Sequence, residues 1–206
     1  MKSLENVSHL LACCAINCLV VGRLSAAPTT IDPDAFSDGT NIGNAFAGVS
    51  LSNPGKADPR VFSLTDPFAS TGPNIFGTSH ATIPQEWGDG FNGGMRADFD
   101  AGVGFVAIDL IGNDSSGDRG RLLAFDASNN LLDAYVSANI GEGAFETAFI
   151  VRPSFDIAYV IATGSADGFE AVSLDNLRFT PIPLPATGWI VSPLLMVFAI
   201  HRKRRA

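Results

Sequence analysis

Cysteine is scarce in this chain of 206 residues, and it is confined to one end. All three cysteines, Cys13, Cys14 and Cys18, lie within the first eighteen residues. The rest of the chain therefore has no disulfide, no thiolate metal site and no cysteine nucleophile. A domain without such cross-links depends on buried apolar surface, and about 150 residues can bury a sufficient core.

Basic residues are also few in the middle of the chain. Residues 28–180 hold 20 acidic and 7 basic residues, a net charge of −13, against −8 for the whole chain. A domain this acidic repels nucleic-acid phosphates and anionic membrane surfaces. Nucleic acid is therefore excluded as a partner, whereas solubility outside the cell and attraction of divalent cations both agree with the charge.

Groups that perform catalysis are equally sparse. His80 is the one histidine of residues 28–180, and no Gly-x-Ser-x-Gly motif presents a serine to it. A glycosidase needs two facing carboxylates, and an acidic domain offers such pairs by chance. We therefore expect no enzyme, and a hydrolase that uses His80 or Glu86 is the opposing hypothesis.

Long apolar runs are missing except near the two ends. The first run, residues 10–21, follows Lys2 and precedes the small residues Ala26 and Ala27. A charged start, an apolar core and small residues at a cleavage site are the pattern of a secretory signal peptide. The run is shorter than the ~20 residues of a membrane span. Residues 1–27 are thus expected to be a signal peptide that signal peptidase cuts at Ala26 or Ala27.

The second run, residues 189–200, lies between a proline-rich motif and a basic cluster. A dozen apolar residues are short for a durable span of ~20, so we expect transient insertion, with the basic cluster on the cytoplasmic side. The cluster consists of Arg202, Lys203, Arg204 and Arg205, and the motif consists of Ile182, Pro183, Leu184, Pro185, Ala186, Thr187 and Gly188.

This order of parts closely resembles the PEP-CTERM sorting signals of Gram-negative bacteria. Their common variant reads Val-Pro-Leu-Pro-Ala, and here Ile182 replaces the valine. The resemblance implies that residues 181–206 are a sorting signal with a short apolar helix. It also implies processing by an exosortase, a membrane cysteine transpeptidase, in an organism that makes exopolysaccharide.

A second signal overlaps the first. Residues 184–188 also fit the LPXTG signal of Gram-positive sortases. Proteins with that signal usually carry a long spacer rich in proline, serine and threonine, whereas this motif directly follows the last expected strand. The PEP-CTERM interpretation is therefore favoured, and both interpretations predict a secreted or cell-surface protein.

Between the ends, apolar residues alternate with the period of strands and no stretch keeps a helical period. We expect an all-β fold: a single antiparallel β-sandwich of jelly-roll type over residues 28–180, flanked by the signal peptide and the short C-terminal apolar helix. Residues 65–94, rich in glycine and proline, are expected to form a long loop. The expected strands are 45–52, 60–64, 95–100, 104–111, 121–127, 131–138, 144–152, 157–163 and 171–180.

The segment 28–180 also resembles the β-sandwich ectodomains found ahead of PEP-CTERM tails, through residues 36–40, 46–52, 156–162 and 173–179. By that resemblance, Asp32, Asp34 and Asp175 are candidate ligands of a structural calcium ion, which prefers oxygen ligands. The alternative is that such residues form turns and cap strand edges.

Aromatic residues in the expected loop are the candidates for ligand binding. Trp87 and Phe91, with Asp89 between them, are suited to bind carbohydrate, and the alternative is that they fill the mouth of the sandwich. The sequence as a whole predicts a non-enzymatic surface or extracellular-matrix protein that its C-terminal signal sorts. The alternative from another class is a carbohydrate-binding module acting on the exopolysaccharide.

Overall fold

The structure, a computed structural model, describes residues 27–181 except 55, 89–92, 116 and 166–169. The expected cleavage residue Ala26, the sorting motif from Ile182 onward and the basic cluster lie outside the described residues. So do Asp89 and Phe91. The described residues form one compact unit.

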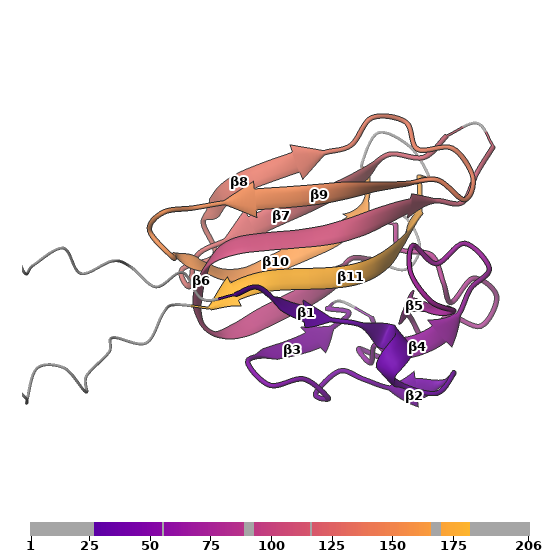
Figure 1. Cartoon of the computed structure of the whole chain (residues 1–206), viewed down its shortest axis with the longest axis horizontal. Helices are drawn as coiled ribbons and strands as arrows, with labels where there is room; N and C mark the ends of the chain where they lie inside the picture. Colours follow the sequence, from indigo (N-terminus) through magenta and orange to yellow (C-terminus); the bar gives the residue numbers. More distant parts are fainter. Residues whose placement is uncertain (1–26, 55, 89–92, 116, 166–169, 182–206) are drawn as a thin grey trace, which may run out of the picture. The chain divides into compact units, whose positions relative to one another are not determined.

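The described residues form eleven strands, and one 3₁₀ turn, Pro33–Ala35, follows the first of them. All of the strand pairs are antiparallel (Figure 1). The strands are β1 (Thr29–Ile31), β2 (Thr40–Asn41), β3 (Val49–Ser52), β4 (Phe62–Thr65), β5 (Asn74–Gly77), β6 (Met95–Gly112), β7 (Gly120–Phe125), β8 (Leu131–Val136), β9 (Phe145–Val151), β10 (Ile157–Gly164) and β11 (Val172–Pro181).

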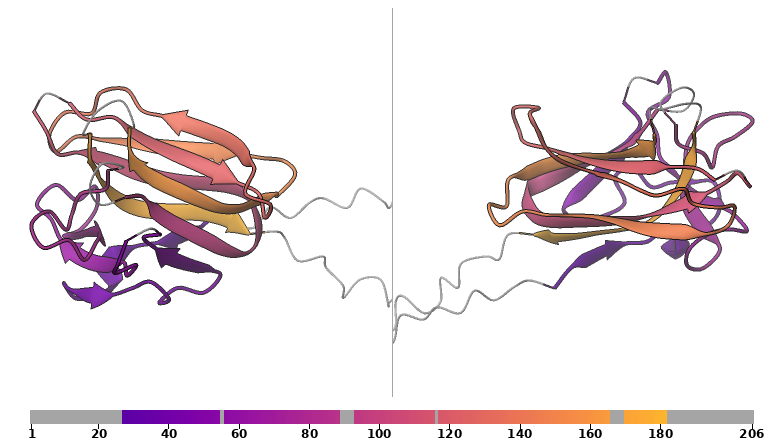
Figure 2. Two further views of the ribbon diagram at one scale, coloured as in Figure 1. Left: turned by 180° about the vertical axis from the view of Figure 1, so that it is seen from behind. Right: turned by 90° about the horizontal axis from the view of Figure 1, so that it is seen from above.

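The long strand β6 belongs to two layers. Its first part pairs with β3 and β10, and β10 continues the layer through β7 to β8. Its second part pairs with β9 and β11, and β11 continues through β5 and β4 to β2. The views from behind and from above show the strands packed as two layers (Figure 2). One continuous sheet thus encloses the core by passing through β6.

Glycines allow β6 to change layers. A Cβ atom at Gly102 would lie 2.3 Å from the carbonyl oxygen of Phe155, and one at Gly104 would lie 2.9 Å from that of Arg152. Real Cβ atoms do not approach so closely, so any larger residue would displace the loop between β9 and β10. The absence of a side chain at these two positions lets that loop pack against the strand where it bends.

The core lies between the layers and follows the alternation of strand residues. Along β7, for example, Leu122 and Ala124 are buried, while Leu123 between them is partly exposed. The largest fully buried side chains come from many parts of the described domain: Ile31, Ile42, Ile75, Phe76, Trp87, Met95, Ile108, Leu110, Ile111, Leu122, Ile157 and Leu174.

The structure confirms the antiparallel all-β expectation and corrects the fold class in three respects. The segments expected as strands 95–100 and 104–111 are one strand, because Gly102 bends the backbone without ending it. The expected loop 65–94 contains β5, whose four residues are all buried. The expected C-terminal apolar helix is not found: the described residues contain no helix beyond the 3₁₀ turn, and residues 189–200 lie outside them.

Candidate functional site

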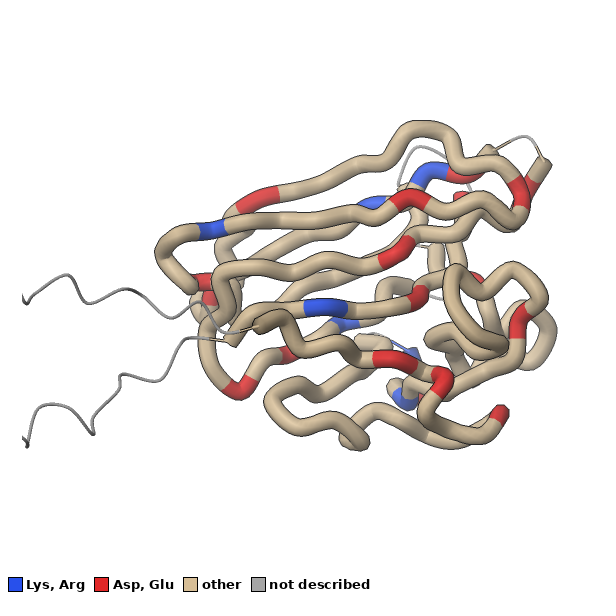
Figure 3. Tube along the Cα trace, in the orientation of Figure 1, with Lys and Arg blue, Asp and Glu red and all other residues tan. Residues whose placement is uncertain are grey.

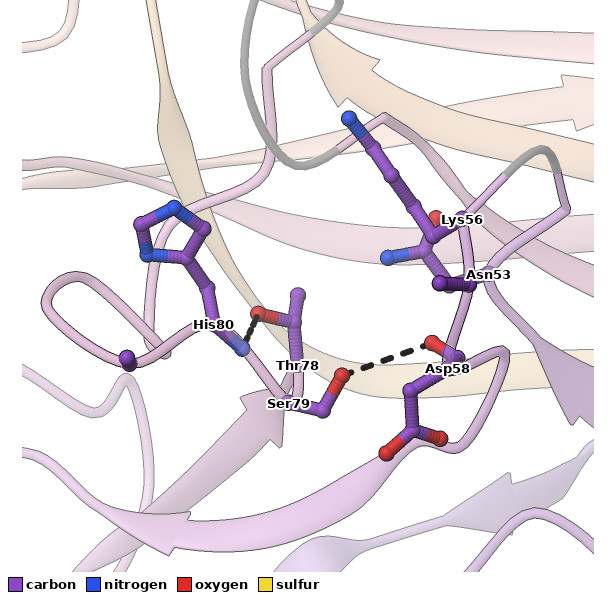
Figure 4. A pocket seen from close by; sticks show the side chains of 8 residues that line it. Asn53, Lys56, Asp58, Thr78, Ser79 and His80 are labelled. Atoms are coloured by element: carbon purple, nitrogen blue, oxygen red, sulfur yellow. Dashed lines mark hydrogen bonds between the residues drawn. The ribbon is translucent and has the colours of Figure 1, made fainter.

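A pocket of about 350 Å³ opens where the loop after β3 meets the end of β5. The loop supplies one wall, and the residues that follow Gly77 supply the other (Figure 4). We call it the Asp58–His80 pocket. Its lining residues are Asn53, Lys56, Ala57, Asp58, Thr78, Ser79, His80 and Ala81.

The acid of this pocket is already paired. The Asp58 carboxylate accepts hydrogen bonds from Nε of Arg60 at 2.8 Å and from its Nη2 at 2.6 Å. These bonds lower the pKa of Asp58 to about 2. The Arg60 guanidinium in turn lies over the ring of Phe62, 5.2 Å from its centre. Asp58 therefore stays ionised at neutral pH and does not serve as an acid there.

His80 is held by its own turn. Its Nδ1 atom accepts hydrogen bonds from the backbone N–H groups of Thr82 and Ile83, both at 3.3 Å. With Nδ1 accepting, the neutral ring carries its proton on Nε2. Thr78 Oγ1 accepts from the backbone N–H of His80 at 3.1 Å, as drawn in Figure 4. The turn thus fixes which ring nitrogen is free to donate.

Ser79, His80 and Asp58 line one pocket but do not form a catalytic relay. The Ser79 hydroxyl donates to the backbone oxygen of Asp58 at 3.4 Å, and the ring of His80 points away from it (Figure 4). A serine nucleophile needs a hydrogen-bonded base, and that base needs an orienting carboxylate. Here Asp58 faces Arg60 and Nδ1 of His80 faces backbone. The arrangement offers donors and acceptors for a small polar ligand.

Glu86, the other residue of the hydrolase hypothesis, is half-buried near this region. Burial is the main cause that raises its pKa, and the charges of Asp118 and Asp66 add to it. The charge of His80 acts in the opposite direction. One carboxyl group with a raised pKa does not make a glycosidase site, because that chemistry needs two facing carboxyl groups.

The three acids expected to bind calcium have separate hydrogen-bonding roles. Asp32 caps the 3₁₀ turn by accepting from the backbone N–H of Asp34 at 2.8 Å, and Asp34 accepts from that of Asn74 at 2.7 Å. Within the described part of the chain, no three acidic, histidine or cysteine side chains are placed to hold a metal ion. The carboxylate oxygens of these acids serve turns and loops, and a calcium site at Asp32, Asp34 and Asp175 stays a prediction.

Asp175 lies in a buried polar network. Its Oδ2 atom accepts from the hydroxyl of Ser70 at 2.9 Å and from the backbone N–H of Thr71 at 3.1 Å, and its Oδ1 accepts from that of Asn176 at 2.8 Å. Burial raises the pKa of Asp175 to about 6 despite these bonds, and the nearby charge of Asp34 adds to the rise.

Asp109 is the centre of this network, and sequence reasoning missed it. It accepts from Thr147 Oγ1 at 2.7 Å, Asn176 Nδ2 at 3.2 Å and Arg178 Nη2 at 2.5 Å. It also lies 3.0 Å from Ser70 Oγ, whose single proton it shares with Asp175. The bonds tie the loop before β5 to β6, β9 and β11. One signal was available, because an acid within the apolar run 103–112 needs a partner when buried.

The structure also corrects the expected role of Trp87. Its side chain is 0% exposed, and its Nε1 donates to the carbonyl oxygen of Phe76 at 2.7 Å. Its backbone pairs with Val172 of β11. Because the ring has no face in solvent, it packs within the core, and it cannot stack on a sugar.

Comparisons with known proteins identify no family for this chain. No family model matches the chain, and no curated protein matches it. The K2 cleaved adhesin domain of Lys-gingipain is 13% identical over 75% of this chain and 99% of its own length, with a TM-score of 0.47. A family 29 carbohydrate-binding module, CBM29-2, is 12% identical over 75% and 91%, with a TM-score of 0.38.

A xylan-binding domain of family 22 is likewise similar, at 13% identity over 70% of this chain and 94% of its own length, with a TM-score of 0.39. With TM-scores below 0.5, these likenesses assign neither a family nor a ligand to the chain.

Across the described residues, no helix has the length and apolar character to cross a membrane.

Proposed function

We propose that this chain is an exported surface protein whose β-sheet domain binds rather than catalyses, and that its C-terminal signal directs its sorting. The observation that carries the proposal is the position of the motif. Strand β11 ends at Pro181, and the motif begins at the next residue, Ile182. A sorting enzyme would thus meet its recognition sequence directly beside a folded domain.

The arrangement of the domain's ends supports the same proposal. Thr29 of β1 pairs with Phe179 of β11, so the chain enters and leaves the domain on neighbouring strands (Figure 1). The expected signal peptide and the sorting signal are therefore attached at one end of the domain. A domain so arranged can leave the membrane as a unit after both segments are cut.

The close spacing also favours an exosortase over a wall-anchoring sortase. A protein fixed to a thick wall needs a long connecting segment, because each extended residue spans at most ~3.6 Å. No residue separates β11 from the motif. The partners that this proposal implies are signal peptidase and an exosortase-type transpeptidase.

Motif variants in the native host test the proposal. Replacing Pro183 and Pro185 with alanine should leave the tail attached, so the protein remains in the membrane fraction with its full mass. Pro193→Ala, which alters a proline outside the motif, is the matched control and should be processed normally. If the motif variant were trimmed and released like the wild type, the sorting proposal would fail.

A second candidate function is carbohydrate binding on the exopolysaccharide. The Asp58–His80 pocket favours it, because hydroxyl, carboxylate and imidazole groups suit a sugar's hydroxyl groups. Ser79→Ala with His80→Ala should weaken binding of the host's exopolysaccharide at least tenfold in titration calorimetry. Equal affinity of the variant and the wild type would remove the pocket from this function.

A further inference from the structure

The outer side of β9 is an unusually apolar surface for this domain. Phe145, Phe149 and Val151 are 54%, 54% and 62% exposed, whereas Ala148 and Ile150 on the other side of the strand are buried. Alternate residues of a strand share one face. Two aromatic rings and a valine thus form a continuous row in solvent. Single exposed apolar residues are ordinary, whereas a contiguous patch marks an interaction site.

Polar groups lie within the same face. Thr147, between the two phenylalanines, is paired in register with Asp109 of β6 and donates to it at 2.7 Å. Arg178 of β11 donates to the same carboxylate at 2.5 Å. The charges here are thus paired with each other, and the face combines aromatic rings, a hydroxyl and a partly exposed guanidinium.

Phe68 extends the apolar surface at the start of β9. A Cβ atom at Gly143 would lie 2.8 Å from Cδ1 of Phe68, so this ring packs on the chain two residues before Phe145. Phe68 belongs to the loop that Ser70 ties to Asp109 and Asp175. We call Phe68, Phe145, Phe149 and Val151 the β9 platform.

Charge decides which partner the platform fits. Acidic side chains outnumber basic ones over the traced domain (Figure 3), and residues 28–180 carry a net charge of −13. A second copy, an acidic polymer and an anionic membrane would all be repelled. A neutral polymer is not repelled, and a sugar ring offers what the platform matches: an apolar C–H face for the aromatic rings and hydroxyls for Thr147 and Arg178.

We propose that the β9 platform binds a neutral polysaccharide chain, with its sugar rings stacked on Phe145 and Phe149. The inference rests on the second candidate function and deepens it, because it names a surface distinct from the Asp58–His80 pocket. The two rings are four residues apart, about 13 Å along a strand at ~3.3 Å per residue. Only a chain of several sugars reaches both rings, so binding strengthens with chain length.

Affinity electrophoresis of the full chain through native gels tests the platform. The probes are the neutral exopolysaccharide fraction of the host, dextran, and alginate as an acidic polymer. At least one neutral probe should retard the wild type, and Phe145→Ala with Phe149→Ala should weaken this retardation about tenfold. Leu131→Ala with Val136→Ala is the matched control, because these β8 side chains are 57% and 55% exposed. It should behave as the wild type does.

Each other outcome contradicts the proposal in a distinguishable way. If neither neutral probe retards the wild type, both the platform and the carbohydrate function fail, while the sorting proposal is untouched. If the double variant is retarded as strongly as the wild type, only the platform fails. Retardation by alginate alone would contradict the charge argument. A dimer in ultracentrifugation that only the double variant loses would make a second copy the occupant. Unchanged thermal unfolding of the variants shows that they fold.

Discussion

Trp87 illustrates how a single side chain supports this domain. The ring is fully buried, and its indole N–H is the partner of the Phe76 carbonyl group on β5. The residue comes from a stretch of glycines and prolines that the sequence assigns to a loop. Its ring nevertheless completes the core, because the loop returns to pair with β11 at Val172.

We therefore expect Trp87→Phe to destabilise the domain without affecting a ligand. The variant leaves the buried carbonyl of Phe76 without its donor, which costs about 1–3 kcal/mol of unfolding free energy. Chemical denaturation measures the loss. Phe68→Leu, at a partly exposed ring, is the control and should stay within about 0.5 kcal/mol. A Trp87→Phe domain as stable as the wild type would contradict the assigned role.

Asp175 gives a prediction for the dependence of stability on pH. Its pKa of about 6 in the folded state lies above the ordinary value near 4, because the carboxyl group is buried. Between these values the folded domain binds a proton that the unfolded chain does not. The free energy of unfolding therefore falls as the pH rises from about 4 to about 6, by up to ~3 kcal/mol from this group.

The test compares the wild type with Asp175→Asn in buffers that contain a chelator. The variant has no titrating group at this position, so the fall between pH 4 and 6 should be absent from its curve. Urea denaturation at half-unit pH steps measures both curves. A difference between the two proteins that stays constant from pH 3.5 to 7 would show that Asp175 does not titrate in this range.

At the residue scale, the sequence shows which polar residues are candidates for a site, but it does not show which groups contact them in the fold. The sequence singled out Asp34 and Asp175 as candidate calcium ligands, yet it could not show that Asn74 and Ser70 donate hydrogen bonds to their carboxylates. It missed Asp109 because that residue sits in an otherwise apolar strand. Such hydrogen bonds join residues far apart in the chain, and no local pattern records them.

At the scale of elements, the pattern of alternation located most strands, and its failures have physical causes. Strand β9 was expected at 144–152 and lies at Phe145–Val151, because exposed and buried residues alternate over its second half. Strand β5 was missed because both of its faces are buried, so alternation is lost. Strand β6 was divided in two because glycines usually end strands.

The bend of β6 supplies a prediction at this scale. Gly102→Ala should destabilise the domain by about 1–3 kcal/mol, because the new methyl group would collide with the Phe155 carbonyl oxygen. Gly141→Ala is the matched control, since no atom lies within 4 Å of a Cβ atom there. Thermal and urea unfolding of both variants measure the effect.

Equal stability of the two glycine variants would contradict the close packing of the loop between β9 and β10 on β6. A large loss in Gly141→Ala would also contradict it, because that position has room for the methyl group. Both replacements lower the conformational entropy of the unfolded chain in the same way, so the difference in stability between the two variants measures the steric effect.

At the scale of the whole molecule, export is inferred from the sequence, and the two candidate binding surfaces are inferred from the structure. The order of motif, apolar run and basic cluster predicted sorting. The pairing of Thr29 with Phe179 brings both ends of the domain together. Neither the Asp58–His80 pocket nor the β9 platform was foreseen, because each joins residues that only the folded sheet brings side by side.

Mass spectrometry of the C-terminal peptide shows whether a sorting enzyme removes the tail. The protein would be taken from the envelope and the medium of its native host. We predict a last residue within 183–188, with residues 189–206 missing. The mass of any added group then separates a wall peptide attached at Thr187 from another surface acceptor. Mature protein that still ends at Ala206 would contradict the proposed sorting and make the tail a plain membrane anchor.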